Sequence, residues 1–131
     1  MAGYTIVNLK DVEDLAPGFG LAPHLQSRFA RGALDLERSG LSHFTIAPGF
    51  RVPFGHRHSV QEEIYVVAVG SALIKLDDEV VELRQWDAVR VPPDIARALQ
   101  GGPDGAEVIA FGAPSAAESD AEMLQDFWDE G

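Results

Sequence analysis

The chain has 131 residues, a length that fits one domain and leaves little room for a second. Its formal net charge of −11 argues against binding to nucleic acid or to an anionic membrane surface, because both select basic patches. It contains no cysteine, so disulfides and thiolate metal sites are excluded. The first residues lack the basic start and apolar core of a secretory signal, and we therefore expect a cytoplasmic location.

Turn signals recur at short intervals along the chain and predict many short strands. We expect a separate strand at residues 4–9, followed by an irregular segment over residues 11–27. The remaining strands are predicted, in chain order, at residues 28–34, 42–47, 51–58, 63–69, 72–76, 80–83, 88–91, 96–99 and 107–111. Since helices and strands do not alternate, the pattern indicates an antiparallel sandwich or barrel with its core at about residues 28–112.

The last segment has a different pattern. Ser115 and Glu118 have the spacing of a capping box, which marks the start of a helix. We therefore predict a short C-terminal α-helix over about residues 115–128, packed on the outside of the barrel. The apolar residues that recur there at helical spacing are Met123, Leu124, Phe127 and Trp128.

A candidate metal site begins with two histidines. His56 and His58 stand two residues apart, and on a strand such residues point to the same face. A carboxylate follows at Glu63, on the next predicted strand, and the neighbouring Glu62 is a second candidate. Two imidazoles and one carboxylate suit a divalent metal such as iron, nickel, manganese or zinc, with coordination positions left open.

The spacing of these residues resembles the first conserved motif of the cupin family. That motif has a glycine, His-x-His, three or four residues, a glutamate, six residues and a glycine. Here it runs from Gly49 through the two histidines to Glu63 and Gly70, with six residues, rather than the family's five, after Gly49. Glu62 satisfies the shorter spacing after the histidines, but only Glu63 is followed by six residues before the glycine.

The second cupin motif is matched mainly by spacing. Fifteen residues separate the end of the first motif from Trp86, where the family has a glycine, and Pro92 keeps the family residue. Asp94 stands in place of a second glycine, and Arg97 stands where the family has its fourth metal-ligating histidine. The resemblance covers roughly residues 42–111.

The resemblance implies an all-β fold, the double-stranded β-helix or antiparallel jelly-roll barrel of a single cupin domain over residues 1–131. It also implies a divalent metal bound in the barrel, but no single reaction, because cupins include dioxygenases, isomerases, decarboxylases, sugar-binding regulators and storage proteins. We expect a small-molecule-binding cupin, with a metal-dependent oxygenase or isomerase as the leading hypothesis. The alternative is a non-catalytic binding or sensor barrel that has lost the fourth metal ligand.

Arg97 is the residue that bears most directly on these alternatives. Arginine stays protonated and offers only hydrogen-bond donors, so it cannot ligate a metal. Placed about 5 Å from a divalent ion, it would be repelled by about 7 kcal/mol at an effective dielectric constant of about 20. Two functional arrangements are open: Arg97 holds an anionic substrate beside the metal, or it pairs with Glu63 and replaces the metal. In a third, structural arrangement Arg97 points outward from its strand.

Three further residues are candidates for lining the substrate pocket. Tyr65 and Phe54 share strand parity with the proposed metal ligands and are expected to line the cavity. His43 either faces the same pocket or is a structural histidine.

We also predict a homodimer. The strand at residues 63–69 is apolar on both faces, so its outer face needs a cover, which is either the C-terminal helix or a second subunit. Residues 4–9 form a predicted strand with no hairpin partner, and an unpaired strand seeks a sheet edge. Exchange of this strand between two copies would close a twofold interface.

Overall fold

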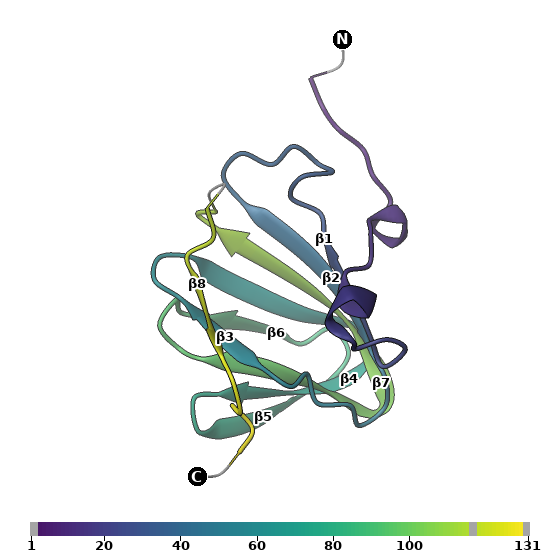
Figure 1. The fold of residues 1–131 in the computed structure, drawn as a ribbon, viewed down its shortest axis with the longest axis vertical. Helices are drawn as coiled ribbons and strands as arrows, with labels where there is room; N and C mark the ends of the chain where they lie inside the picture. Colours follow the sequence, from purple (N-terminus) through teal and green to yellow (C-terminus); the bar gives the residue numbers. More distant parts are fainter. Residues whose placement is uncertain (1–2, 116–117, 130–131) are drawn as a thin grey trace.

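The computed structural model describes residues 3–115 and 118–129. Its strands belong to one eight-stranded sheet, whose pairings are antiparallel and which curls into a half-closed barrel (Figure 1). Two short 3-10 helices, η1 (Leu9–Asp11) and η2 (Ala16–Phe19), precede the first strand. The described part of the chain contains no helix with the length and apolar character that crossing a membrane requires. The predicted antiparallel jelly-roll architecture is confirmed.

The longest strands, β4 and β7, pair with each other and bend together. The strands are β1 (Leu25–Phe29), β2 (Gly40–Ile46), β3 (Gly55–His58), β4 (Glu62–Leu76), β5 (Glu79–Leu83), β6 (Ala88–Val91), β7 (Arg97–Ala113) and β8 (Ala121–Leu124). The register of β4 on β7 shifts between Val67 and Val69 and again between Gly70 and Ala72. Such irregularities bend a strand, so the first half of β4 pairs with β6 and the second half with β5.

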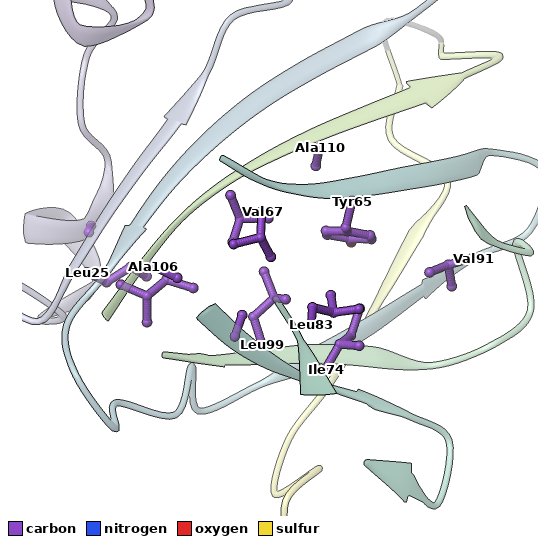
Figure 2. Packing of buried hydrophobic residues seen from close by; sticks show 13 residues of the cluster. Leu25, Tyr65, Val67, Ile74, Leu83, Val91, Leu99, Ala106 and Ala110 are labelled. Atoms are coloured by element: carbon purple, nitrogen blue, oxygen red, sulfur yellow. The ribbon is translucent and has the colours of Figure 1, made fainter. Parts of the chain in front are cut away.

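The hydrophobic core lies between the two halves of the bent sheet. Figure 2 shows Tyr65 and Val67, which come from the first half of β4. They face Ile74 from the second half of β4 and Leu99 from β7. Val67 and Ile74 are fully buried. The core therefore fills the barrel around the side chains that β4 turns inward, and Tyr65 belongs both to this core and to the site described below.

Gly70 marks the closest approach of the two long strands. Its φ is +71°, and a Cβ atom there would lie 2.1 Å from the carbonyl oxygen of Gly105. Glycine adopts this left-handed conformation without steric cost and leaves room for the neighbouring backbone. The glycine that ends the first motif is thus required by the bend of the sheet.

The prediction of an N-terminal strand at residues 4–9 is wrong for this single chain. Residues 4–8 belong to no strand, and η1 begins at Leu9. The adjacent sheet edge is contacted instead by Asp14, which bridges to Arg28 of β1. Residues 4–8 reach away from the barrel (Figure 1).

The predicted C-terminal helix over residues 115–128 is also wrong. Residues 116–117 lie outside the described ranges, and β8 pairs along four residues with β3, antiparallel to it. The outer edge of β3 offers unpaired backbone groups, which a returning strand satisfies and a helix would not. In addition, Asp126 and Asp129 would have stood at the negative end of the helix dipole.

Candidate metal centre

Strand β3 and the start of β4 bring the three predicted metal ligands together. His56 and His58 lie on β3, and Glu63 lies on β4. Donor atoms from the three side chains lie within 4.8 Å of one another. Glu62 is exposed instead, and its Oε2 lies 2.6 Å from Nε of Arg90. The structure therefore places Glu63, and not Glu62, beside the two histidines.

The carboxylate of Glu63 is the centre of this cluster. Its Oε1 lies 3.2 Å from Nε2 of His56 and 3.4 Å from Nε2 of His58, and it accepts a hydrogen bond of 2.8 Å from the Tyr65 hydroxyl. Burial raises the pKa of Glu63, but the hydrogen bonds with His56 and Tyr65 and the nearby imidazole of His58 outweigh burial and hold the pKa well below its usual value. Burial also raises the pKa of the Tyr65 hydroxyl, which keeps this donor protonated.

His58 is held through one nitrogen of its ring. Its Nδ1 lies 2.7 Å from Oδ1 of Asp120, and its buried Nε2 makes no hydrogen bond within residues 3–115 and 118–129. Burial lowers the pKa of His58, but the nearby carboxylates of Glu63 and Asp120 raise it more, so that the net pKa is raised. A buried imidazole nitrogen without a hydrogen bond, beside an ionised carboxylate, is suited to meeting a cation.

Asp120 is a residue in contact with the candidate site that the sequence patterns did not single out. It lies just before β8, and its Oδ2 accepts hydrogen bonds from the backbone N–H groups of Val60 and Gln61, at 2.8 and 2.9 Å. Burial raises the pKa of Asp120, but the hydrogen bonds from Gln61, His58 and Val60 hold it well below its usual value. The local sequence carried no signal for this role, because the predicted helix placed Asp120 on the outside of the barrel.

Arg97 faces the interior, so the third alternative, in which it points outward from its strand, is wrong. It is paired in register with His56 across β3 and β7, and its side chain is only 1% exposed. Its Nη2 donates to the carbonyl of Pro92 at 2.8 Å, while its Nη1 lies 3.6 Å from Oε1 of Glu63. Within the described residues, its Nε and Nη1 have no hydrogen-bond partner. A buried cation with unused donors thus stands beside the candidate ligands.

His43 does not join the cluster. In the sheet it lies opposite Ile109, which in turn lies opposite Val66, so it points to the other face from Tyr65. Its Nε2 is 2.9 Å from Oε1 of Glu107 on that outer face. The structure therefore places His43 away from the candidate metal ligands.

Phe54 and Trp86 lie at two further positions that the sequence analysis named. Phe54 is partly buried just before β3, and its role as a lining residue stays a prediction. Trp86, which stands where the family motif has a glycine, has φ +70° and is 70% exposed. The backbone N–H of Trp86 donates to the carbonyl of Val67 at 2.7 Å. The left-handed turn that favours glycine is thus kept at this position although the residue has changed.

The donor set fits a divalent cation in its chemistry. Two imidazoles and an ionised carboxylate converge, and His58 has a buried nitrogen free of hydrogen bonds in the described structure. The guanidinium of Arg97 supplies an opposing positive charge close to the same carboxylate. The chemistry of these residues is therefore compatible with a cation, with an anion beside Arg97, or with both.

No family model matches the chain. A segment of 71 residues, 53% of the chain, is 28% identical to an uncharacterized protein of Methanocaldococcus jannaschii. The match spans 57% of that relative's length.

Comparison with solved structures is more informative. A cupin protein of Bacteroides fragilis superposes with a TM-score of 0.71 at 22% identity, over 91% of each chain. Oxalate decarboxylase of Bacillus subtilis gives a TM-score of 0.73 at 17% identity, over 95% of this chain and 33% of that one. The Streptomyces nucleoside dehydratase Pac13 gives 0.69 at 18% identity, over 96% and 92%. Together with the curled antiparallel sheet, these likenesses show that the chain has the cupin fold.

Proposed function

We propose that this barrel binds a divalent cation at His56, His58 and Glu63 and a small anionic molecule beside Arg97. The observation that carries the proposal is the convergence of the three side chains within 4.8 Å, with Nε2 of His58 buried and free of hydrogen bonds in the described residues. Three protein ligands leave coordination positions open for a substrate. A bound divalent cation would polarise an oxygen atom of that substrate.

The proposed anion site rests on the unused donors of Arg97. Its Nε and Nη1 are buried without a hydrogen-bond partner among the described residues, and unsatisfied buried donors are costly. A carboxylate or phosphate group would accept a charge-assisted hydrogen bond from one of these two donors. Such an anion would also offset the repulsion between Arg97 and the cation.

The leading enzymatic proposal is a metal-dependent oxygenase or isomerase. Its support is the pairing of open metal positions with a separate anchor for an anionic group, which together could orient a small substrate. Two of the similar folds are named as enzymes, an oxalate decarboxylase and a nucleoside dehydratase, so a barrel of this architecture can house catalysis.

A second candidate function is a non-catalytic binding or sensor barrel. It is favoured by the 3.6 Å ion pair between Arg97 and Glu63, since this pair balances the charge of the carboxylate without a metal. In this case the site would recognise a small molecule through Arg97, Tyr65 and the histidines.

Metal analysis and anion titration test both candidates. Protein purified without chelator is analysed for metal, and stoichiometric iron, nickel, manganese or zinc supports the cation site. Inorganic phosphate and small mono- and dicarboxylates are then titrated by calorimetry against wild type and Arg97→Gln. We expect binding that Arg97→Gln abolishes. A well-folded protein that takes up no divalent metal would favour the sensor barrel, and binding unaffected by Arg97→Gln would contradict the anion site.

We further propose that the protein is a homodimer. The C-terminal segment covers β3 and leaves Ile64 and Phe111 on the outer face 39% and 43% exposed. Tyr4 and Ile6 on the projecting N-terminal segment are 73% and 83% exposed. Exposed apolar residues on an unpaired arm and on a sheet face could cover each other across a twofold axis.

A further inference from the structure

The C-terminal strap, residues 118–129, closes the edge of the barrel next to the candidate metal centre. Its strand β8 pairs with β3, so the strap lies directly on the strand that carries both histidines (Figure 1). On the exposed side of this pair, Oε2 of Glu122 lies 2.7 Å from Nε of Arg57. The strap is therefore part of the wall that surrounds the site.

The far end of the strap is fixed to the barrel as well. The indole N–H of Trp128 donates to the carbonyl of Val52 at 2.8 Å, and Lys75 donates to the carbonyl of Phe127. A Cβ atom on Gly55 would lie 2.6 Å from the ring of Phe127, so this ring packs directly on the β3 backbone. These contacts hold the strap in one position over β3.

The fixed strap places the carboxylate of Asp120 against His58. Oδ1 lies 2.7 Å from the Nδ1 atom of the ring, and Oδ2 accepts from the N–H groups of Val60 and Gln61 in the connection between β3 and β4. Both oxygens of the carboxylate are thus engaged. Asp120 cannot turn away from the imidazole without giving up two backbone hydrogen bonds.

This contact decides which nitrogen of His58 carries the proton. An ionised carboxylate only accepts hydrogen bonds, so Nδ1 must be the donor. In the neutral ring, Nε2 then keeps its lone pair, and this is the nitrogen that lies 3.4 Å from Oε1 of Glu63. A metal ion binds the lone pair of a neutral imidazole, and the hydrogen bond at the other nitrogen sets the tautomer.

We propose that Asp120 is a positioning residue of the candidate metal centre, which holds the ring and the tautomer of His58 so that Nε2 is ready to bind the metal. The inference rests on the metal site proposed above. The inference also implies that docking of the strap and metal binding are coupled. Docking of the strap favours metal binding, and metal binding favours docking of the strap.

The test compares Asp120→Ala and Asp120→Asn with Glu122→Ala. Glu122 is the matched control, because it lies on the same strap and its loss removes the same charge, but it faces Arg57 rather than the site. Affinity for Co²⁺ is measured by competition with a chelating dye. We expect a loss of about 10–100-fold in the Asp120 variants, the range found for residues that orient a ligand, and no comparable loss in Glu122→Ala.

The tautomer is read separately, by nitrogen-15 NMR of the imidazole in metal-free protein. In wild type and Glu122→Ala, His58 should carry its proton on Nδ1 when neutral, whereas the Asp120 variants should populate the Nε2–H form. Should Asp120→Ala fail to fold, Asp120→Asn and the wild-type spectrum still decide the matter. An Nε2–H tautomer in wild type overturns the proposal, and so does unchanged Co²⁺ affinity in folded Asp120 variants.

The same experiment separates this inference from the proposed function. If wild type binds no Co²⁺ but its His58 tautomer depends on Asp120, the metal site fails and the positioning role of Asp120 stands. If wild type binds Co²⁺ and the Asp120 variants match Glu122→Ala in affinity and tautomer, the metal site stands and the positioning role fails.

Discussion

His56 and Arg97 are direct partners across the antiparallel strands β3 and β7. Side chains of cross-strand partners stand on the same side of a sheet, so a proposed metal ligand and a permanent positive charge share the interior of the barrel. The distance of 3.6 Å from Nη1 of Arg97 to Oε1 of Glu63 brings that charge to the proposed carboxylate ligand as well. Variants at these positions should therefore have large and opposite effects on cation affinity.

We expect Glu63→Gln to lower Co²⁺ affinity by at least about a hundredfold, because it removes the only negative charge among the three ligands. Loss of a residue that merely orients a metal ligand already lowers metal affinity by about 10–100-fold, and loss of a ligand should cost more. His56→Ala should abolish binding. Glu62→Gln is the control, since Glu62 is exposed and paired with Arg90. Competition titration against a chelating dye measures all three. Equal losses in the two glutamine variants would show that the carboxylate ligand is not Glu63.

Arg97→His should raise Co²⁺ affinity by about tenfold or more, a difference of about 1.4 kcal/mol. The change removes a repelling charge and introduces an imidazole opposite His56, so both effects act in the same direction. The variant is first compared with wild type by circular dichroism to establish that it is folded. Unchanged affinity in a folded Arg97→His protein would mean that residue 97 does not act on the cation.

Metal binding should weaken as the pH falls through the pKa of His58. Burial lowers this pKa, but the nearby carboxylates of Glu63 and Asp120 raise it more, so it lies above the usual 6.5. A protonated imidazole has no lone pair to offer, so protonation of His58 alone should lower the affinity by up to about tenfold per pH unit below its pKa. Calorimetric titrations with Co²⁺ in a series of buffers measure the profile. A midpoint below 6.5 would contradict a raised pKa for His58.

Light scattering at micromolar concentration should give the mass of a homodimer for the full chain. Deletion of residues 1–9 removes Tyr4 and Ile6, which are 73% and 83% exposed, and should yield a monomer or a protein prone to aggregation. Ile64→Asp on the outer face is a second variant that should weaken association. A monomeric full-length chain at that concentration would refute the dimer.

Gly70→Ala should lower the free energy of unfolding by about 2–4 kcal/mol, because φ is +71° and the new Cβ would lie 2.1 Å from a backbone carbonyl oxygen. Gly18→Ala is the control. No heavy atom lies within 4 Å of a Cβ built there, and its effect should stay within about 0.5 kcal/mol. Denaturation in urea measures both. Similar stabilities for the two variants would show that the β4–β7 contact tolerates a side chain.

The site could be predicted from sequence wherever it depended on local periodicity. His56 and His58 lie on one face because strand side chains alternate, and the next strand supplies Glu63 after a short connection. The same parity placed Tyr65 with these residues, and it donates to Glu63 at 2.8 Å. Parity alone could not place His43, since the face of a strand depends on the register it adopts with its neighbours.

The sequence by itself determined the antiparallel sandwich or barrel and four of the residues that meet inside it, because turn signals, strand alternation and motif spacing are local properties. Only the tertiary structure decided that residues 4–8 form no strand and that residues 121–124 form a strand rather than a helix. Residues 121–124 carry a pattern compatible with a helix, but short helices are marginal alone, and the open edge of β3 offered them backbone partners. That edge is created by the fold, and it brings Asp120 to His58 from 62 residues away along the chain, a contact that no local pattern could contain.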